Sequence, residues 1–407
     1  MFKTKIKTIV LAASAIIMAI GLITFPEDAF EASIRGLNMW WEIVFPSLLP
    51  FFIISELLIG FGVVKFIGVI LEPIMRPLFK VPGVGGFVLA MGMASGFPSG
   101  AKYTARMRQE KQLSRIEAER LVSFTNYSSP LFMFGAVSVG FFHNSSLGIM
   151  LALSHYLGNI CVGLMMRFYG KDEEKLNSYH KKTPSIKTAL QQMHRTRMNE
   201  KRPLGKLLGD AVLSSIHTLL MIGGFIILFS VINKLLFHMN ITTFLAQGVI
   251  IVLHTLHFPE ELSIAFISGL SEITLGSQMT SGIEQATLMQ KAIVTSFILG
   301  FSGFSIQAQV ASILAETDIR FSPFFFARIV HGFLAAAFTF ILWKPIYEKI
   351  GLNGLNGQPS NSNPVFMMND NGIGIHLYEK MMDYGPLITI AFLTLYLFIG
   401  FKRNFVH

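Results

Sequence analysis

Long apolar segments separated by short polar stretches make up most of the chain. The clear ones cover residues 9–25, 39–62, 121–140, 147–166, 213–237, 292–314, 324–343 and 387–401. A helix needs about 20 apolar residues to cross the hydrocarbon core of a bilayer. The pattern therefore predicts an all-α polytopic membrane protein with about eight transmembrane helices.

Two further apolar segments are too short to cross as helices. Residues 84–98 lead into a stretch from Gly92 to Lys102 that carries three glycines and a proline, and residues 262–277 have Glu272 near their centre. A broken helix at membrane depth lines a cavity or is buried in protein. Small residues also let two helices pack closely, so each segment alone leaves both interpretations open.

These features recur in the same order in the two halves of the chain. Phe124 follows Gly92 at the same spacing at which Phe301 follows Gly269, so one constant offset relates both pairs. In each half, the short interrupted segment is followed by a span with a polar centre. Matched pairs of interrupted segments are typical of inverted-repeat transporters. We therefore expect an inverted repeat that contains two re-entrant interrupted segments.

Charge placement assigns the two faces of the membrane. Basic residues flank residues 84–98 on both sides, and the hydrophilic stretch 171–206 holds ten Lys and Arg against four Asp and Glu. The positive-inside rule places such segments in the cytoplasm. With a cytoplasmic N-terminus, residues 84–98 enter and leave from the cytoplasm and the second half is inverted. Lys344 and Lys349 are exceptions, because this topology puts them outside.

These observations divide the chain into six parts. We predict an N-terminal transmembrane helix at 1–35, a first repeat at 36–170, a basic cytoplasmic linker at 171–206, a second repeat at 207–346, a polar loop at 347–385 and a C-terminal transmembrane helix at 386–407. The N-terminal run is expected to be a helix rather than a signal peptide, because no small-x-small cleavage site follows it.

Composition supports a membrane protein. The chain is 52% hydrophobic and 14% charged, with a mean hydropathy of +0.55, whereas soluble domains carry about 25% charged residues. The net charge of +9 is explained by the basic stretches between apolar segments, so we expect no nucleic-acid partner. The single cysteine, Cys161, excludes an intramolecular disulfide and a Cys-based metal or redox motif.

Four ionisable residues in or beside the apolar segments are candidates for coupling or gating: Glu56, Lys102, Glu272 and Arg328. For Glu56 the alternatives are snorkelling to the interface or pairing with Lys65, and for Lys102 snorkelling alone. Glu272 has three open roles: a protonated acid, a ligand for a coupling cation or proton, or a partner of Arg328.

Four motifs resemble the nucleoside-recognition "Gate" domain. They are Ser95-Gly96-Phe97-Pro98-Ser99-Gly100-Ala101-Lys102, Thr125-Asn126-Tyr127-Ser128-Ser129-Pro130, Gly269-Leu270-x-Glu272-x-Thr274-x-Gly276 and Ser302-Gly303-Phe304-Ser305. Over nearly its full length the chain is similar to the sporulation integral membrane protein family YlbJ, also called SpoVV, of endospore-forming bacteria. The resemblance implies two Gate-like repeats in a multi-pass protein of the outer forespore membrane, needed for dipicolinate to move from mother cell to forespore.

The resemblance leaves alternatives open. Gate domains also occur in concentrative nucleoside transporters and in ferrous iron transport proteins. A transporter of nucleosides or other small solutes, and a non-transporting membrane scaffold of a sporulation complex, therefore stay as alternatives.

Dipicolinate is a planar dianion with a ring nitrogen, so a site that binds it requires hydrogen-bond donors and positive charge. Backbone N–H groups at the N-termini of broken helices carry partial positive charge, and hydroxyl and amide groups add donors. The residues that we expect to bind the solute are Ser95, Gly96, Ser99, Gly100, Asn126, Ser128, Ser129, Thr274, Ser302, Gly303, Ser305 and Gln307.

We expect no enzyme. The sequence has no His-Glu-x-x-His, no Gly-x-Ser-x-Gly, no Walker motif and no paired aspartates in a span, so we also expect no cofactor, no metal ion and no catalytic residue. The expected partners are the lipid bilayer and a small anion. Homo-oligomers and complexes with other sporulation membrane proteins are left open.

Overall fold

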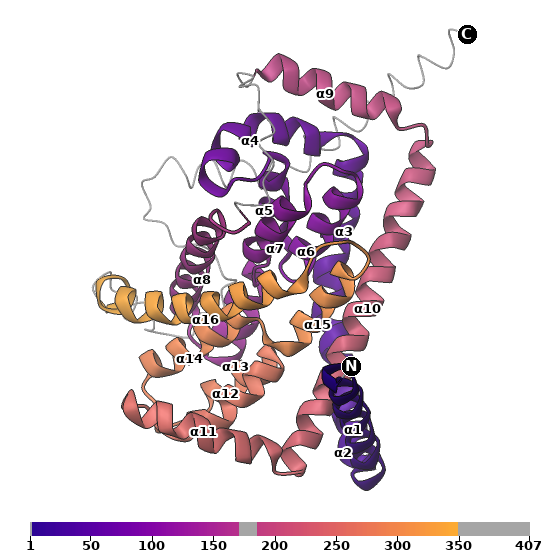
Figure 1. Ribbon diagram of the computed structural model, residues 1–407. Helices are drawn as coiled ribbons and strands as arrows, with labels where there is room; N and C mark the ends of the chain where they lie inside the picture. Colours follow the sequence, from indigo (N-terminus) through magenta and orange to yellow (C-terminus); the bar gives the residue numbers. More distant parts are fainter. Residues whose placement is uncertain (1, 171–184, 349–407) are drawn as a thin grey trace. The chain divides into compact units, whose positions relative to one another are not determined.

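The computed structural model describes residues 2–170 and 185–348, and every regular element in these two stretches is a helix (Figure 1). Five of the described helices are long and apolar enough to cross a membrane, or six if one bent pair counts as a span. With several shorter apolar helices, this confirms an all-α polytopic membrane protein. The predicted loop at 347–385, beyond its first two residues, and the C-terminal helix at 386–407 lie outside the described residues.

Two 35-residue helical spans dominate the described structure. The first joins α2 (Pro26–Met39), the π-helical η1 (Trp40–Val44) and α3 (Phe45–Gly60), and the second is α10 (Leu204–His238). They pack antiparallel, because Gly60 lies against Leu207 at one end and Asp28 contacts His238 at the other. The helix α1 (Phe2–Thr24) packs on both. The first span thus begins at Pro26, before the predicted start at residue 39, and proline suits the first turn of a helix.

Each 35-residue span is followed by a shorter helix, α4 (Val63–Phe79) in the first half and α11 (Ile241–Thr255) in the second. The chain bends by 86° between α4 and the next helix. Within the predicted basic linker, the structure has a helix that the sequence analysis missed, α9 (Ile186–Asn199), and it packs along α4. The carbonyl of Met193 approaches Gly62 so closely that a side chain there has no room.

The two interrupted segments are helical hairpins. The first consists of α5 (Val84–Ser95) and α6 (Ser99–Gln109), and the second of α12 (Leu262–Ser271) and α13 (Ile273–Ser281). The rings of Phe87 and Tyr103 lie 5.9 Å apart across the first hairpin. Across the second, Gly276 packs directly on the backbone of Gly269, where a Cβ would clash. Both segments therefore turn back on themselves, as re-entrant segments do.

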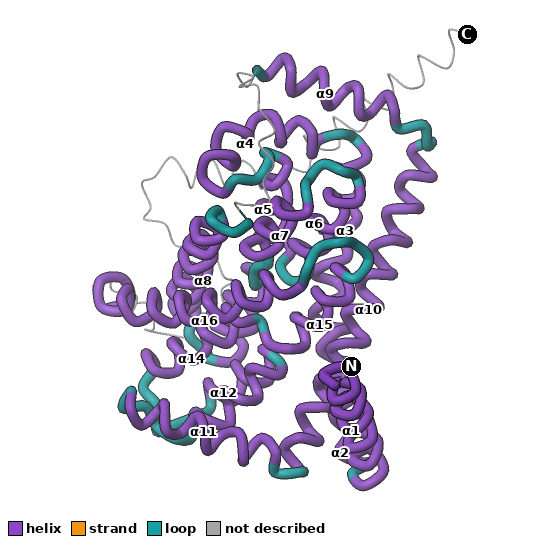
Figure 2. Tube along the Cα trace, in the orientation of Figure 1, coloured by secondary structure: helices purple, strands orange, loops and turns teal. Residues whose placement is uncertain are grey.

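Each hairpin is followed by a broken span and then by an unbroken one. The elements are α7 (Arg115–Thr125), π-helical η2 (Leu131–Phe141) and α8 (Ser145–Met166) in the first half, and α14 (Leu288–Phe301), α15 (Gly303–Leu314), α16 (Phe321–Leu342) and the π-helical η4 (Trp343–Glu348) in the second. Figure 2 shows the breaks as short loop-coloured interruptions between helices.

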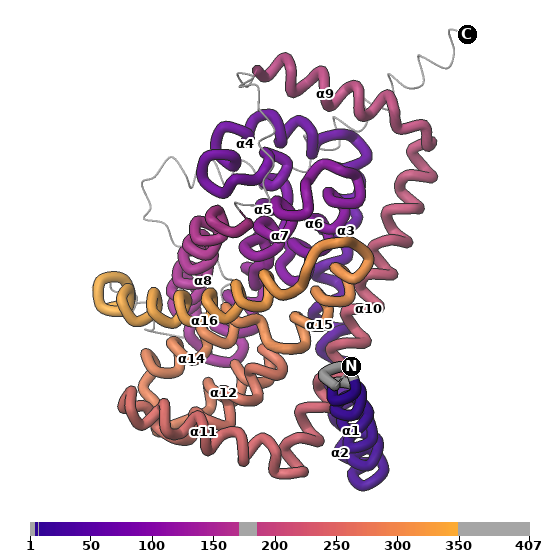
Figure 3. Tube along the Cα trace, in the orientation of Figure 1, coloured from indigo at the N-terminus to yellow at the C-terminus, as the bar shows by residue number. Residues whose placement is uncertain are grey.

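The order of elements in the second half repeats that in the first at a nearly constant sequence offset. The halves also exchange contacts reciprocally. α16 of the second half packs on α7 of the first, while α14 packs on α8 (Figure 3, where the first half is indigo to magenta and the second pink to orange). Reciprocal contacts of this kind are what a two-fold relationship between the halves requires.

Candidate functional site

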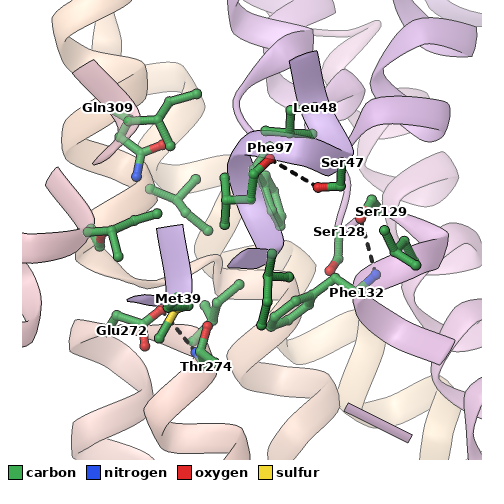
Figure 4. A pocket seen from close by; sticks show the side chains of 18 of the residues that line it. Met39, Ser47, Leu48, Phe97, Ser128, Ser129, Phe132, Glu272, Thr274 and Gln309 are labelled. Carbon is green, nitrogen blue, oxygen red and sulfur yellow. Dashed lines mark hydrogen bonds between the residues drawn. The ribbon is translucent and has the colours of Figure 1, made fainter. Parts of the chain in front are cut away.

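The breaks of both halves meet around one cavity of about 100 Å³, which we call the central cavity (Figure 4). Most of its lining consists of residue pairs that occupy corresponding positions in the two halves, at the offset that relates their helices. The pairs are Val44 and Ile222, Leu48 and Ile226, Ser95 and Glu272, Phe97 and Thr274, Ser128 and Ser305, Ser129 and Ile306, and Phe132 and Gln309. Because each half supplies the same positions, the central cavity lies on the pseudo-two-fold axis that relates them.

The tip of the first hairpin borders the central cavity through Ser95 and Phe97. The Ser95 hydroxyl donates to the carbonyl oxygen of Met91 at 2.6 Å and lies 2.9 Å from the hydroxyl of Ser99. Gly96 has a φ of +80° and faces Ser129 at a distance that excludes any Cβ. Glycine is required there for both reasons. Serine hydroxyls thus shape the tip from within the hairpin, and Gly96 lets it pack closely on Ser129 of the next broken span.

The tip of the second hairpin carries a carboxylate at the position of Ser95. Glu272 caps α13, accepting hydrogen bonds from the N–H groups of Thr274 at 3.0 Å and Leu275 at 2.8 Å. Helix N-termini attract anions, and here the protein's own side chain takes that place. Among the described residues that line the central cavity, Glu272 is the one with a formal charge.

The break between α7 and η2 places two serines in the central cavity. The N–H of Ser128 donates to Nε2 of His155 at 3.0 Å, while the buried Ser128 hydroxyl has no hydrogen-bond partner in residues 2–170 and 185–348. The hydroxyl of Ser129 accepts from the N–H of Phe132 at the start of η2. A buried hydroxyl without a partner costs free energy, so Ser128 is the lining group most in need of a polar ligand.

Asn126, in the same break, faces away from the central cavity. Its Oδ1 accepts from the N–H of Ala101 at 3.1 Å and its Nδ2 donates to the carbonyl of Val122 at 2.8 Å. Gly100 packs on the carbonyl of Thr125 so closely that a Cβ there would clash with the oxygen. Both residues therefore join the first hairpin to α7.

At the break between α14 and α15, polar side chains also hydrogen-bond to the backbone. Ser302 and Gly303 both have left-handed backbone conformations, with φ of +68° and +61°. The Ser302 hydroxyl and the Gln307 amide both donate to the carbonyl of Phe301, at 2.6 and 3.1 Å. These residues satisfy the carbonyl that the break frees, and Ser305 is the predicted residue of this group that reaches the central cavity.

The structure thus separates the predicted solute residues into two groups. Those that line the central cavity are Ser95, Ser128, Ser129, Thr274 and Ser305, together with the predicted coupling residue Glu272. Those that lie behind it and shape the breaks are Gly96, Ser99, Gly100, Asn126, Ser302, Gly303 and Gln307. Sequence reasoning missed Gln309 and the lining from the two long spans, such as Ile222. Gln309 is the counterpart of Phe132 in the second half, so applying the offset to the positions beside each break identifies it.

Arg328 lies behind the central cavity, fully buried on α16. Its guanidinium donates to the carbonyl of Asn126 at 3.0 Å, to the carbonyl of Ser123, and to Oδ1 of Asn159 at 2.8 Å. A cation at the C-terminal end of α7 offsets the negative end of the helix dipole. The alternative in which Arg328 pairs with Glu272 is wrong, because Glu272 caps α13 instead.

Glu56 and Lys102 form an ion pair with 3.4 Å between Oε1 and Nζ. The ammonium also lies 4.6 Å from the ring centroid of Phe52. Neither residue lines the central cavity. The alternative that pairs Glu56 with Lys65 is therefore replaced by a bridge from α3 to α6.

Comparison with known proteins adds to this geometry. A family model described as "Nucleoside recognition", named Gate, matches residues 41–145. The chain is 56% identical over 405 residues to "Sporulation integral membrane protein YlbJ" of Bacillus subtilis (strain 168), which covers 97% of this chain and 96% of the relative. The chain belongs to the YlbJ family. No solved structure matches it. Family and fold together define a multi-pass integral membrane protein of transporter-like build.

Proposed function

We propose that this protein moves dipicolinate across the outer forespore membrane during sporulation. The observation that supports the proposal best is the central cavity, where the interrupted segments of both halves meet on the pseudo-two-fold axis. Inverted-repeat transporters hold their substrates at the repeat interface, on discontinuous helices near the midplane. A scaffold protein has no need for polar groups at matched breaks in both halves.

The lining suits a small planar solute with several acceptors. The hydroxyls of Ser128 and Ser305, the amide of Gln309 and the hydroxyl of Thr274 come from three different breaks. Phe97 and Phe132 add aromatic faces, which stack on planar rings. A site with a few placed donors in an apolar surround is typical of small-molecule pockets.

Glu272 determines how such a site accepts an anion. Two like charges about 4 Å apart repel by roughly 4 kcal/mol at an effective dielectric constant of 20. We propose that Glu272 takes up a proton together with the solute, which removes the repulsion and turns the carboxyl into a hydrogen-bond donor. A proton gradient then drives solute movement.

A nucleoside is the second candidate, and one observation favours it. The family model that matches residues 41–145 is described as nucleoside recognition. A nucleoside is neutral and planar at its base, so it pays no electrostatic cost beside Glu272. Its hydroxyls also complement the serine-rich lining.

Uptake into proteoliposomes tests the proposal and separates the candidates. The purified full-length chain is reconstituted, and uptake of labelled dipicolinate and labelled nucleosides is measured with and without an inward proton gradient. We expect dipicolinate uptake above that of empty vesicles, increased by the gradient in the wild type and not in Glu272→Gln. Nucleoside uptake alone would assign the second candidate. Uptake of neither solute would favour the scaffold.

A further inference from the structure

A second cavity lies along the same helices as the central cavity. Its volume is about 470 Å³, and we call it the outer cavity. Charged and polar side chains of α3, α6, α10 and the α9–α10 connection line it, among them Glu56, Arg106 and Ser214. Its lining is far more polar than that of the central cavity, as suits a chamber that meets water.

Three elements run from one cavity to the other. On α3, Leu48 lines the central cavity and Glu56 lines the outer cavity. On α10, Ile222 lines the central cavity and Ser214 lines the outer cavity. Eight residues of helix span roughly 12 Å, and the two helices are antiparallel, so both place the cavities at the same separation. The first hairpin does likewise, from its tip to Arg106. The two cavities are therefore successive chambers of one path bounded by α3, α10 and the α5–α6 hairpin.

Three buried side chains lie on these elements between the two chambers, and we call them the buried layer. Phe52 of α3 and Tyr103 of α6 are both fully buried, with ring centroids 6.4 Å apart in an edge-to-face arrangement. Thr218 of α10, also buried, is four residues from Ser214 and four from Ile222, which places it on the same helix face. The layer thus draws one residue from each of the three elements.

An ionic bridge lies next to this layer. Lys102 contacts Glu56 at 3.4 Å and the Phe52 ring at 4.6 Å, and the hydroxyl of Ser214 donates to Glu56 at 3.4 Å. The bridge therefore links α6, α3 and α10. The Lys102 ammonium forms no hydrogen bond of good geometry with any residue that the structure describes, so charge and the aromatic face hold it. The Lys102 contacts therefore separate without breaking a directed hydrogen bond of the ammonium, which suits an element that opens and closes.

We propose that the Glu56–Lys102 pair and the Phe52–Tyr103 layer form the gate between the central and outer cavities. The proposal rests on the proposed transport function, because a gate serves a solute path. It is also asymmetric between the halves. Lys234, the counterpart of Glu56 in the second half, pairs instead with Asp28 and Glu31, so the second half carries a different ion pair at this position.

Cysteine accessibility tests the gate without any solute. In full-length protein carrying Cys161→Ser, Leu48→Cys reports on the central cavity. A small, membrane-impermeant methanethiosulfonate is applied to inverted vesicles, which expose the predicted cytoplasmic face, and the labelling rate is followed by mass spectrometry. We expect slow labelling in this background, and a rate at least about fivefold higher, the factor for about 1 kcal/mol, when Glu56→Gln or Lys102→Gln breaks the pair. The charge swap Glu56→Lys with Lys102→Glu should return the rate to within about twofold of the background.

Lys206→Gln is the matched control. Lys206 is an exposed lysine of α10 that lines neither the central nor the outer cavity, so its loss removes a charge without touching the gate. Its labelling rate should stay at the background value. Equal rates in all variants, or equal increases in Lys206→Gln and in the charge swap, would overturn the gate. Because no solute is present, these rates are independent of the uptake result: loss of dipicolinate uptake changes the substrate assignment and leaves the gate test standing.

Discussion

His155 and His331 are far apart in the chain, and their ring centroids lie 4.6 Å apart. Both are fully buried, and Nε2 of His331 is 2.8 Å from the carbonyl oxygen of His155. They occupy corresponding places on α8 and α16. A residue that meets its own counterpart lies on the axis of a two-fold relationship, so the pair marks where that axis passes the unbroken spans.

His331→Gln should weaken the junction between the halves. The imidazole meets the His155 carbonyl through Nε2 and lies 3.1 Å from an Arg328 nitrogen through Nδ1, and a glutamine amide cannot fill both ring-nitrogen positions, so one buried polar group is left unmatched. We expect the free energy of unfolding to fall by about 1–3 kcal/mol, measured by denaturant titration in detergent. His217→Gln, on the exposed face of α10, should change it by less than about 0.5 kcal/mol. Equal losses in both variants would contradict a special role for the pair.

Arg328→Lys should be poorly tolerated although it conserves the charge. Lysine lacks the planar fork that reaches the Ser123 and Asn126 carbonyls and Asn159 together. Hydrogen bonds to charged groups contribute about 1.5–3 kcal/mol each, so the loss of one or two lowers the free energy of unfolding by about 3 kcal/mol. The same change at the exposed Arg195 should leave the free energy of unfolding unchanged. Thermal unfolding of the two variants compares them, and a stable Arg328→Lys protein would be inconsistent with this account.

The Arg108–Asp318 ion pair should make stability depend on acid. It joins α6 to the connection before α16 through two hydrogen bonds, of 2.8 and 2.7 Å. The Arg108 guanidinium lowers the pKa of Asp318 below its usual 3.8. The stabilisation is therefore complete above pH 3.8 and is lost as the pH falls through the lower folded-state pKa. Because the pair is half-exposed, its contribution is at most about 1 kcal/mol. The stability difference between wild type and Asp318→Asn should be constant from pH 7 to 5 and shrink below pH 3.8, and a difference that grows with acid would oppose it.

Ser128→Ala should reduce transport without reducing stability. The Ser128 hydroxyl has no hydrogen-bond partner among the described residues, so its removal leaves the free energy of unfolding within about 0.5 kcal/mol of that of the wild type. If it donates to the solute, kcat/KM for uptake falls about fivefold to thirtyfold, as expected for about 1–2 kcal/mol. Ser138→Ala is the control, because that buried hydroxyl donates to the Met133 carbonyl away from the central cavity. Unchanged uptake in Ser128→Ala would remove Ser128 from the site.

The sequence predicted the architecture because its signals are physical requirements of the membrane. Apolar length identifies spans, and glycine, proline and hydroxyl residues mark where helices break. The constant offset between the halves identified the two interrupted segments as counterparts. The structure places both of their tips, Ser95 and Glu272, in one cavity. What it could not supply is the direction of each side chain at a break. Asn126 and Ser128 are two residues apart, yet one binds backbone behind the cavity and the other faces into it.

Long-range packing explains the other differences. The apolar face of α10 gives no sign that Ile222 lines a cavity, since lipid and cavity both accept isoleucine. The helix α9 was hidden by its basic composition, because charge predicts topology and says little about whether a segment folds onto α4. Glu56 pairs with Lys102 and not with Lys65, which is nearer in the sequence, because the first hairpin folds back toward α3.

Filling the central cavity tests the central claim most directly. Ile222→Trp adds a large ring to a cavity of about 100 Å³, and Leu220→Trp places the same ring on an exposed position of the same helix. Both proteins are reconstituted at equal density after their folding has been checked by size-exclusion chromatography. We predict that uptake of labelled dipicolinate falls at least tenfold in Ile222→Trp and stays within about twofold of wild type in Leu220→Trp. Equal uptake by the two folded variants would contradict a solute site shared between the halves.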